Sequence, residues 1–127
     1  MNSLGWNCQG LGNPWLVRVL HDLVRQWAPK LVFLLETKLK SRRMERIRDR
    51  IGFANGIFVP SCGHSGGLAL LWTREINLEI KSYSNHHIDA IVSETNSNFK
   101  WRITGFYGHP QAHLRQFSWD LLANLKG

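Results

Sequence analysis

The stretch that decides the fold is Leu31-Val32-Phe33-Leu34-Leu35-Glu36-Thr37-Lys38, in which an apolar run ends in a carboxylate. An uninterrupted apolar run of this length predicts a strand that is buried on both of its faces. A carboxylate is costly to bury, so Glu36 is expected either to reach water or to have a cationic partner. Ligands collect at the carboxyl ends of strands in layered α/β folds, and Glu36 is therefore a candidate functional residue.

The residues before this strand predict the rest of a β-α-β unit. Residues 3–8 have the pattern of a first strand, and a glycine-rich turn follows them. Asn13 suits the N-cap and Pro14 the first position of a helix whose apolar residues recur at helical spacing. Asn7 then lies near the end of a strand that neighbours the one ending at Glu36. Their side-chain oxygens suit a hard cation, although both residue types are also common in ordinary turns.

The remaining sequence predicts a second helix, a series of hairpins and a closing helix. Ser41 can cap a helix that runs to about Arg50 and has an apolar inner side. From Gly56 onward the hydrophobic period changes to two, and short turns separate the segments, so we expect an antiparallel meander. The expected strands are residues 57–59, 67–72, 76–83, 87–94 and 99–107. The closing helix is expected from Gln111, with an apolar face made of Leu114, Phe117, Leu121, Leu122 and Leu125.

These elements predict an α/β chain with one mixed sheet and with its helices on one side of that sheet. A chain of 127 residues is ordinarily a single domain. The apolar strands have two faces to cover, and no further segment of the sequence supplies a layer for the second face. We therefore expect the isolated chain to expose apolar surface and to be poorly soluble.

The net charge of +7 indicates an anionic partner. Nucleic acid attracts such proteins through counterion release, and anionic membrane surfaces attract them as well. No apolar run approaches 18 residues, so no membrane span is expected. Cys8 and Cys62, in a sequence without a visible export signal, predict reduced thiols and a nuclear or cytoplasmic location.

Arg42, Arg46 and Arg50 recur at i, i+4 spacing on the outer side of the second helix. Like charges at this spacing repel by a few tenths of a kcal/mol per pair, although Glu45 and Asp49 relieve part of the repulsion. A use for this stripe would be contact with the phosphates of nucleic acid. The plain alternative is a helix face that simply meets solvent.

Four motifs occur along the chain in an order that matches a known superfamily. They are Trp6-Asn7-Cys8-Gln9-Gly10-Leu11-Gly12, Leu34-Leu35-Glu36-Thr37-Lys38, Ser65-Gly66-Gly67-Leu68-Ala69-Leu70-Leu71-Trp72 and Thr104-Gly105-Phe106-Tyr107-Gly108-His109-Pro110. Together they resemble the endonuclease/exonuclease/phosphatase superfamily, and most of all the apurinic-type endonuclease domain of plant non-LTR retrotransposons. The resemblance covers nearly the whole chain but only the amino-terminal half of that domain. It implies the first half of a four-layer α/β/β/α sandwich of the deoxyribonuclease-I-like type.

The resemblance also implies a metal-dependent enzyme that hydrolyses DNA phosphodiester bonds. Asn7 and Glu36 match the residues that help to bind the catalytic Mg²⁺, for which Mn²⁺ could substitute. Gln9 stands where many members have an acid, which weakens cation binding. Tyr107 matches a tyrosine that contacts the scissile phosphate, and a single hydrogen-bond donor in such a place is worth on the order of 10²–10³ in rate.

The sequence lacks the Gly-Asp-x-Asn and Ser-Asp-His segments that complete the site in the superfamily. Those segments supply general acid–base catalysis, which is worth roughly 10²–10⁴ in rate, so this chain alone is expected to be inactive. Three alternatives stay open. They are a catalytically dead remnant that binds nucleic acid, a phosphoesterase of the same fold that acts on a phosphoinositide or phospholipid, and a gene-model artefact that never accumulates as folded protein.

Overall fold

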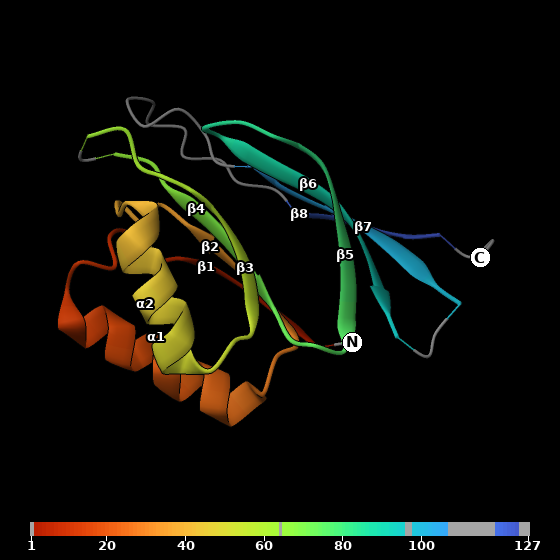
Figure 1. Cartoon of the computed structure of the whole chain (residues 1–127), viewed down its shortest axis with the longest axis horizontal. Coiled ribbons are helices and arrows are strands. Elements are labelled where there is room, and N and C mark those ends of the chain that lie inside the picture. Colours follow the sequence, from red (N-terminus) through yellow and green to blue (C-terminus); the bar gives the residue numbers. More distant parts are fainter. Residues whose placement is uncertain (1, 64, 96–97, 107–118, 125–127) are drawn as a thin grey trace.

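Three layers make up the chain in the computed structural model (Figure 1). The structure describes residues 2–63, 65–95 and 98–105, together with the backbone of residues 106 and 119–124. Helices α1 (Pro14–Trp27) and α2 (Ser41–Ile51) lie on one face of a four-stranded sheet. A second four-stranded sheet covers the opposite face of the first. The chain is therefore of the expected mixed α/β class, but it has two sheets rather than one.

The first sheet has the strand order β1-β2-β4-β3. Its strands are β1 (Ser3–Asn7), β2 (Leu31–Leu35), β3 (Asn55–Val59) and β4 (Leu68–Trp72). β1 and β2 are parallel, whereas β4 is antiparallel to both of its neighbours. Every residue of β2 is buried, which confirms the expectation of a strand that is covered on both faces.

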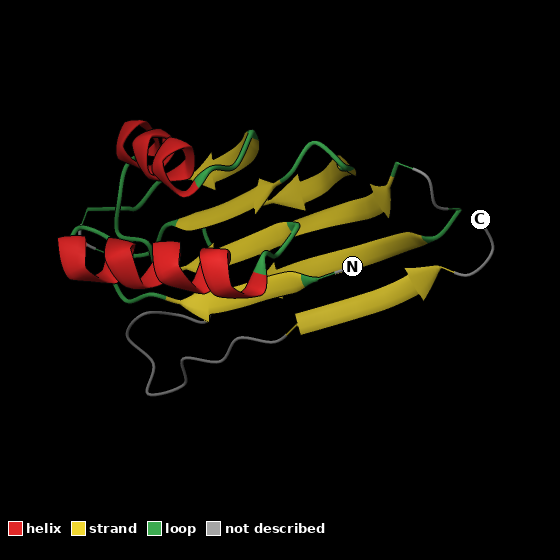
Figure 2. Cartoon of the chain, turned by 90° about the horizontal axis from the view of Figure 1, so that it is seen from below, coloured by secondary structure: helices red, strands yellow, loops and turns green. Residues whose placement is uncertain are grey.

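Local sequence explains how the two helices begin over this sheet (Figure 2). Asn13 caps α1, because its side-chain oxygen accepts a hydrogen bond from the backbone N–H of Trp15 at 3.0 Å. The start of α2 differs from the expectation, since Lys40 occupies the N-cap position without a side-chain hydrogen bond and Ser41 is the first helical residue. Neither of these helices, the two found among the described residues, is long and apolar enough to cross a membrane. Their buried sides pack in one core with Val32, Leu34, Ala69 and Leu71 of the sheet.

The second sheet has the strand order β5-β6-β7-β8, with every neighbouring pair antiparallel. Its strands are β5 (Ile76–Tyr83), β6 (His87–Glu94), β7 (Lys100–Phe106) and β8 (Trp119–Asn124). The run from β5 to β7 confirms the expected meander. Each sheet is built from one continuous part of the chain, because the first sheet ends with β4 and the second begins with β5.

The expectation that one face of the first sheet is bare is wrong. Ile88, Ala90 and Val92 of β6 and Ile103 of β7 are buried in a core that they share with Phe33 and other residues of the first sheet. The alternating apolar residues of these strands do not extend the first sheet but make the inner face of a second one. The second sheet therefore covers the face whose exposure was the reason to expect poor solubility.

The outward side of the second sheet carries a polar cluster on β6 and β7. Asp89 is buried, and its carboxylate accepts hydrogen bonds from Arg102 Nη2 at 2.6 Å, Arg102 Nε at 3.1 Å and Thr104 Oγ1 at 3.0 Å. The hydrogen bonds from Arg102 are the main cause that holds the pKa of the Asp89 carboxyl below its ordinary value, against the opposing effect of burial. The buried charge on this side of the sheet, the Asp89 carboxylate, is therefore paired with Arg102.

The expected closing helix is wrong where the structure can be compared with it. Residues 119–124 form β8, which pairs antiparallel with β7. The rest of the expected helix lies outside the described residues. Pairing with β7 gives the backbone of both strands hydrogen-bond partners, and such tertiary context overrides the helical spacing of the apolar residues.

Candidate functional site

The ends of β1 and β2 form the candidate site. The two strands are parallel and Asn7 lies opposite Leu35, so Glu36 follows at the same edge of the sheet. An antiparallel pair would have put the two residues at opposite edges. Tyr107, the third residue expected here, lies outside the described residues.

Glu36 is almost fully buried, with 1% of its surface exposed. It leaves the strand through the left-handed backbone region, with φ 57°, which turns the chain sharply after Leu35. Its backbone carbonyl accepts a hydrogen bond from the Gly10 N–H at 2.8 Å, and its Oε1 lies 3.9 Å from Lys38 Nζ. Of the two expected outcomes, contact with water or a cationic partner, the structure shows the second, with Lys38 of the same loop as the partner.

Gly67 holds this loop from the side of β4. The N–H of Thr37 donates a hydrogen bond to the carbonyl of Gly67 at 3.0 Å, and the N–H of Lys38 donates one to the carbonyl of Gly66 at 2.8 Å. Gly67 has φ 92°, and a Cβ added there would collide with Thr37 Oγ1 and lie 3.0 Å from Lys38 N. Only glycine combines this backbone conformation with so close an approach. Gly66 and Gly67 thus hold the loop that follows Glu36 in place.

Cys8 also belongs to this edge, although the sequence reasoning gave it no role there. Its Sγ donates a hydrogen bond to the carbonyl of Leu35 at 3.1 Å, and its side chain is buried in the core under the helices. Burial raises the pKa of the Cys8 thiol to about 12, and the Glu36 carboxylate acts in the same direction. Cys8 follows Leu4 and Trp6 at period-two spacing, and those two residues pack against the same core. This spacing could have shown from the sequence that Cys8 faces the core.

The stability of the protein is expected to fall above about pH 9 because of Cys8. The thiol ionises near 9.0 in the unfolded chain but keeps its proton to about 12 in the folded chain, so the unfolded state loses its proton first. The stabilisation is complete below the lower pKa and declines by about 1.4 kcal/mol per pH unit above it. Urea unfolding of the wild type and of Cys8→Ala measures this effect. The free energy of unfolding of the wild type should fall about 2–3 kcal/mol further than that of the variant by pH 11, and parallel pH profiles would contradict the assignment.

The donors at the edge fit part of a Mg²⁺ coordination shell. Asn7 Oδ1 accepts a hydrogen bond from the Gln9 N–H at 3.3 Å, and an amide oxygen has a second lone pair for a ligand. Mg²⁺ keeps several of its waters and is commonly bound through only one or two protein carboxylates. Across residues 2–63, 65–95 and 98–105, no group of three or more His, Cys, Asp or Glu side chains could hold a metal ion. Asn7 and Glu36 are the two residues at this edge whose side-chain oxygens could serve as cation ligands, one neutral and one anionic.

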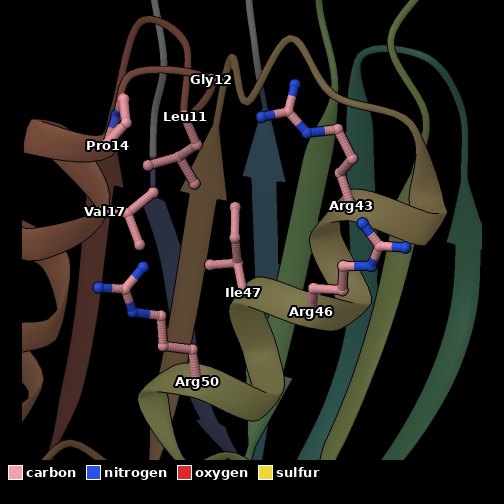
Figure 3. Close-up of a pocket in the computed structure, with 8 residues that line it drawn as sticks. All are labelled: Leu11, Gly12, Pro14, Val17, Arg43, Arg46, Ile47 and Arg50. Carbon is pink, nitrogen blue, oxygen red and sulfur yellow. The ribbon is translucent and has the colours of Figure 1, made fainter.

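The packing of α2 places two of the three expected arginines at a hollow and leaves the third outside it. Arg46 and Arg50 line a hollow between α1 and α2, as does Arg43, which the i, i+4 pattern missed (Figure 3). Arg42 is exposed and does not line the hollow. The apolar inner side of the helix, already visible in the sequence, could have shown which arginines face α1.

The two stacked sheets, the helices on the outer face of the first sheet and the polar strand edge define a deoxyribonuclease-I-like α/β sandwich, the expected fold type. Among solved structures, the chain is similar to a crystal structure of D. rerio TDP2 humanized by 14 mutations, with a TM-score of 0.51 and 19% sequence identity. The similarity covers 80% of this chain and 47% of that chain, so this chain spans about half of that protein's length. No family model and no curated protein matches the sequence.

Proposed function

We propose that this chain is the metal-binding part of a phosphodiesterase of the endonuclease/exonuclease/phosphatase superfamily, close to the apurinic-type endonucleases of plant non-LTR retrotransposons. The parent reaction is hydrolysis of a DNA phosphodiester bond. One observation carries the proposal: Asn7 and the buried carboxylate of Glu36 end neighbouring parallel strands in a deoxyribonuclease-I-like fold. The order of the four sequence motifs supports it.

The proposed site residues have three roles: metal binding, contact with the reacting phosphate and contact with the DNA backbone. Asn7 and Glu36 would hold Mg²⁺, or Mn²⁺ in its place, through their side-chain oxygens. When bound, such a cation polarises a phosphoryl oxygen and lowers the pKa of a water molecule. Tyr107 would donate a hydrogen bond to the phosphate. The arginines proposed to contact the DNA backbone are Arg42, Arg46 and Arg50.

The chain contains neither a Gly-Asp-x-Asn nor a Ser-Asp-His segment. We therefore propose that these 127 residues bind metal and nucleic acid without cutting DNA. A purely binding protein is the second candidate function, and the arginines at the hollow between the helices favour it.

Metal titration of the 127-residue chain tests the role of Glu36. Mn²⁺ binding, followed by electron paramagnetic resonance, should weaken by at least about tenfold in Glu36→Gln, because even residues that only support a metal ligand change affinity by about 10–100-fold. Glu45→Gln, an exposed carboxylate on α2, is the control with the same charge change and should bind as the wild type does. Equal affinity of Glu36→Gln and the wild type would overturn the proposed metal site.

Nicking of supercoiled plasmid in the presence of Mg²⁺ tests catalysis separately. We expect no nicking above the rate of a metal-free control, because the residues for general acid–base chemistry are lacking. Nicking by the wild type that Glu36→Gln abolishes would show that the chain already contains a working site, and would contradict the inactive state proposed here.

A further inference from the structure

The hollow between α1 and α2 has an apolar floor and a basic rim. It measures about 250 Å³ and lies in the helical layer. The floor is formed by the buried side chains of Leu11, Val17 and Ile47. Figure 3 shows Arg43 reaching toward the loop at Gly12 and Arg50 reaching toward α1, whereas the end of the Arg46 side chain, which also lines the hollow, points away from α1.

The charge on this rim is not balanced by any acid among the described residues. None of the described Asp and Glu residues lines the hollow, and none forms a salt bridge with Arg43, Arg46 or Arg50. Asp49, an acid of α2, pairs instead with Arg48 at 3.1 Å. Pro14, the first residue of α1, lines the hollow, and neither helix has an acidic residue in its first turn. The positive end of the α1 dipole therefore adds to the positive potential at the hollow. The hollow is therefore built to attract an anion.

The arginines form a row rather than a single cluster. A helix rises 1.5 Å per residue, so Arg43 and Arg50 are about 10.5 Å apart along α2. A single phosphate suits one or two of these side chains, whereas a run of phosphates matches the row. The hollow of about 250 Å³ has room for a few sugar or base groups but not for a duplex, whose major groove alone is about 12 Å wide.

We propose that the groove between α1 and α2 binds single-stranded nucleic acid. Successive phosphates contact Arg43, Arg46 and Arg50, and the sugars and base edges rest on the apolar floor. Such contacts hold the strand without reading its sequence. The inference rests on the nucleic-acid partner of the proposed function, but it needs neither a metal ion nor catalysis at the strand edge.

Fluorescence anisotropy of the 127-residue chain with a labelled oligothymidylate tests the groove. The probe has about 12 nucleotides, within the usual range of single-strand sites, and the buffer contains a chelator. The variant R43Q/R46Q/R50Q should bind at least about tenfold more weakly. Its plot of log K against log salt should be shallower by about 2, because each lost phosphate contact removes about 0.7 from the slope. Glutamine keeps a good helix propensity at these positions.

The matched control is R74Q/K81Q/K100Q, which removes the same charge from exposed residues outside the groove. It should bind within about threefold of the wild type, since only diffuse attraction is lost.

Equal weakening by both triple variants would overturn the groove as the site. Competition by a blunt duplex as effective as that by the oligothymidylate would overturn the preference for single strands, and so would retention on phosphatidylserine vesicles without oligonucleotide binding. Mn²⁺ binding by R43Q/R46Q/R50Q should stay unchanged, which separates failure of this site from failure of the site at Glu36.

Discussion

Gly67→Ala is expected to lower the free energy of unfolding by about 3 kcal/mol. Two costs combine. Alanine at φ 92° is strained, which costs on the order of 1–2 kcal/mol. Its Cβ also collides with Thr37 Oγ1 and presses on Lys38 N, and the buried loop can relieve that contact only by moving. Urea unfolding with a linear extrapolation measures the loss.

Gly66→Ala is the matched control for this prediction. Gly66 also has a positive φ, 77°, but a Cβ added there has nothing within 4 Å. It should show the backbone cost of about 1–2 kcal/mol alone. Gly67→Ala should in addition weaken Mn²⁺ binding, because a shifted Thr37 carries Glu36 with it. Equal destabilisation by the two variants would show that the contact with Thr37 is not tight.

Gly105→Ala is expected to destabilise the protein by about 3 kcal/mol, at the upper end of the range for overpacked cores. Gly105 of β7 faces the ring of Phe33 in β2, and a Cβ there would collide with that ring. Phe33 has 0% of its surface exposed and is enclosed by both sheets, so the ring has no space to yield. The change therefore forces the two sheets apart, and denaturant unfolding reports the cost.

A double-mutant cycle with Phe33→Leu isolates this contact. Leucine lacks the distal ring carbons that the new Cβ would strike, so Gly105→Ala should cost markedly less in the Phe33→Leu background. We expect a coupling free energy of about 1–3 kcal/mol. Strictly additive effects would mean that Gly105→Ala acts elsewhere, for example on the strand pairing of β7.

The β-α-β unit of the first sheet could be predicted from the sequence because its signals are local. Asn13 and Pro14 mark the start of α1, and the unbroken apolar run of β2 requires cover on both faces. The second sheet could not be separated from the first in the same way. Alternation in β5 and β6 shows which residues face a core, but it does not show to which sheet a strand belongs. Residues 119–124 were misread because their apolar spacing suits a helix, whereas their pairing with β7 is a tertiary effect.

The candidate site also has a part that the sequence predicts and a part that only the structure shows. The strand-end positions of Asn7 and Glu36 follow from the β-α-β unit, since a right-handed crossover makes the two strands parallel neighbours. The partner of Glu36 depends on a left-handed turn, which no spacing rule in the sequence encodes, so the role of Lys38 is recognisable only in three dimensions. Arg43 differs, because its i, i+3, i+7 spacing with Arg46 and Arg50 places all three on one helix face.

The division of the chain into two consecutive sheets also sets an order for folding. Among the described residues, each strand pairing joins segments within the same half of the chain, so each half can form its backbone hydrogen bonds before the halves meet. The contact between Phe33 and Gly105, by contrast, joins residues that are far apart in sequence and forms only when the halves meet. We therefore expect docking of the two sheets to be the late, slow event in folding. During that interval the apolar inner faces of both sheets are open to other chains, and this is the period in which the protein is most exposed to misassembly.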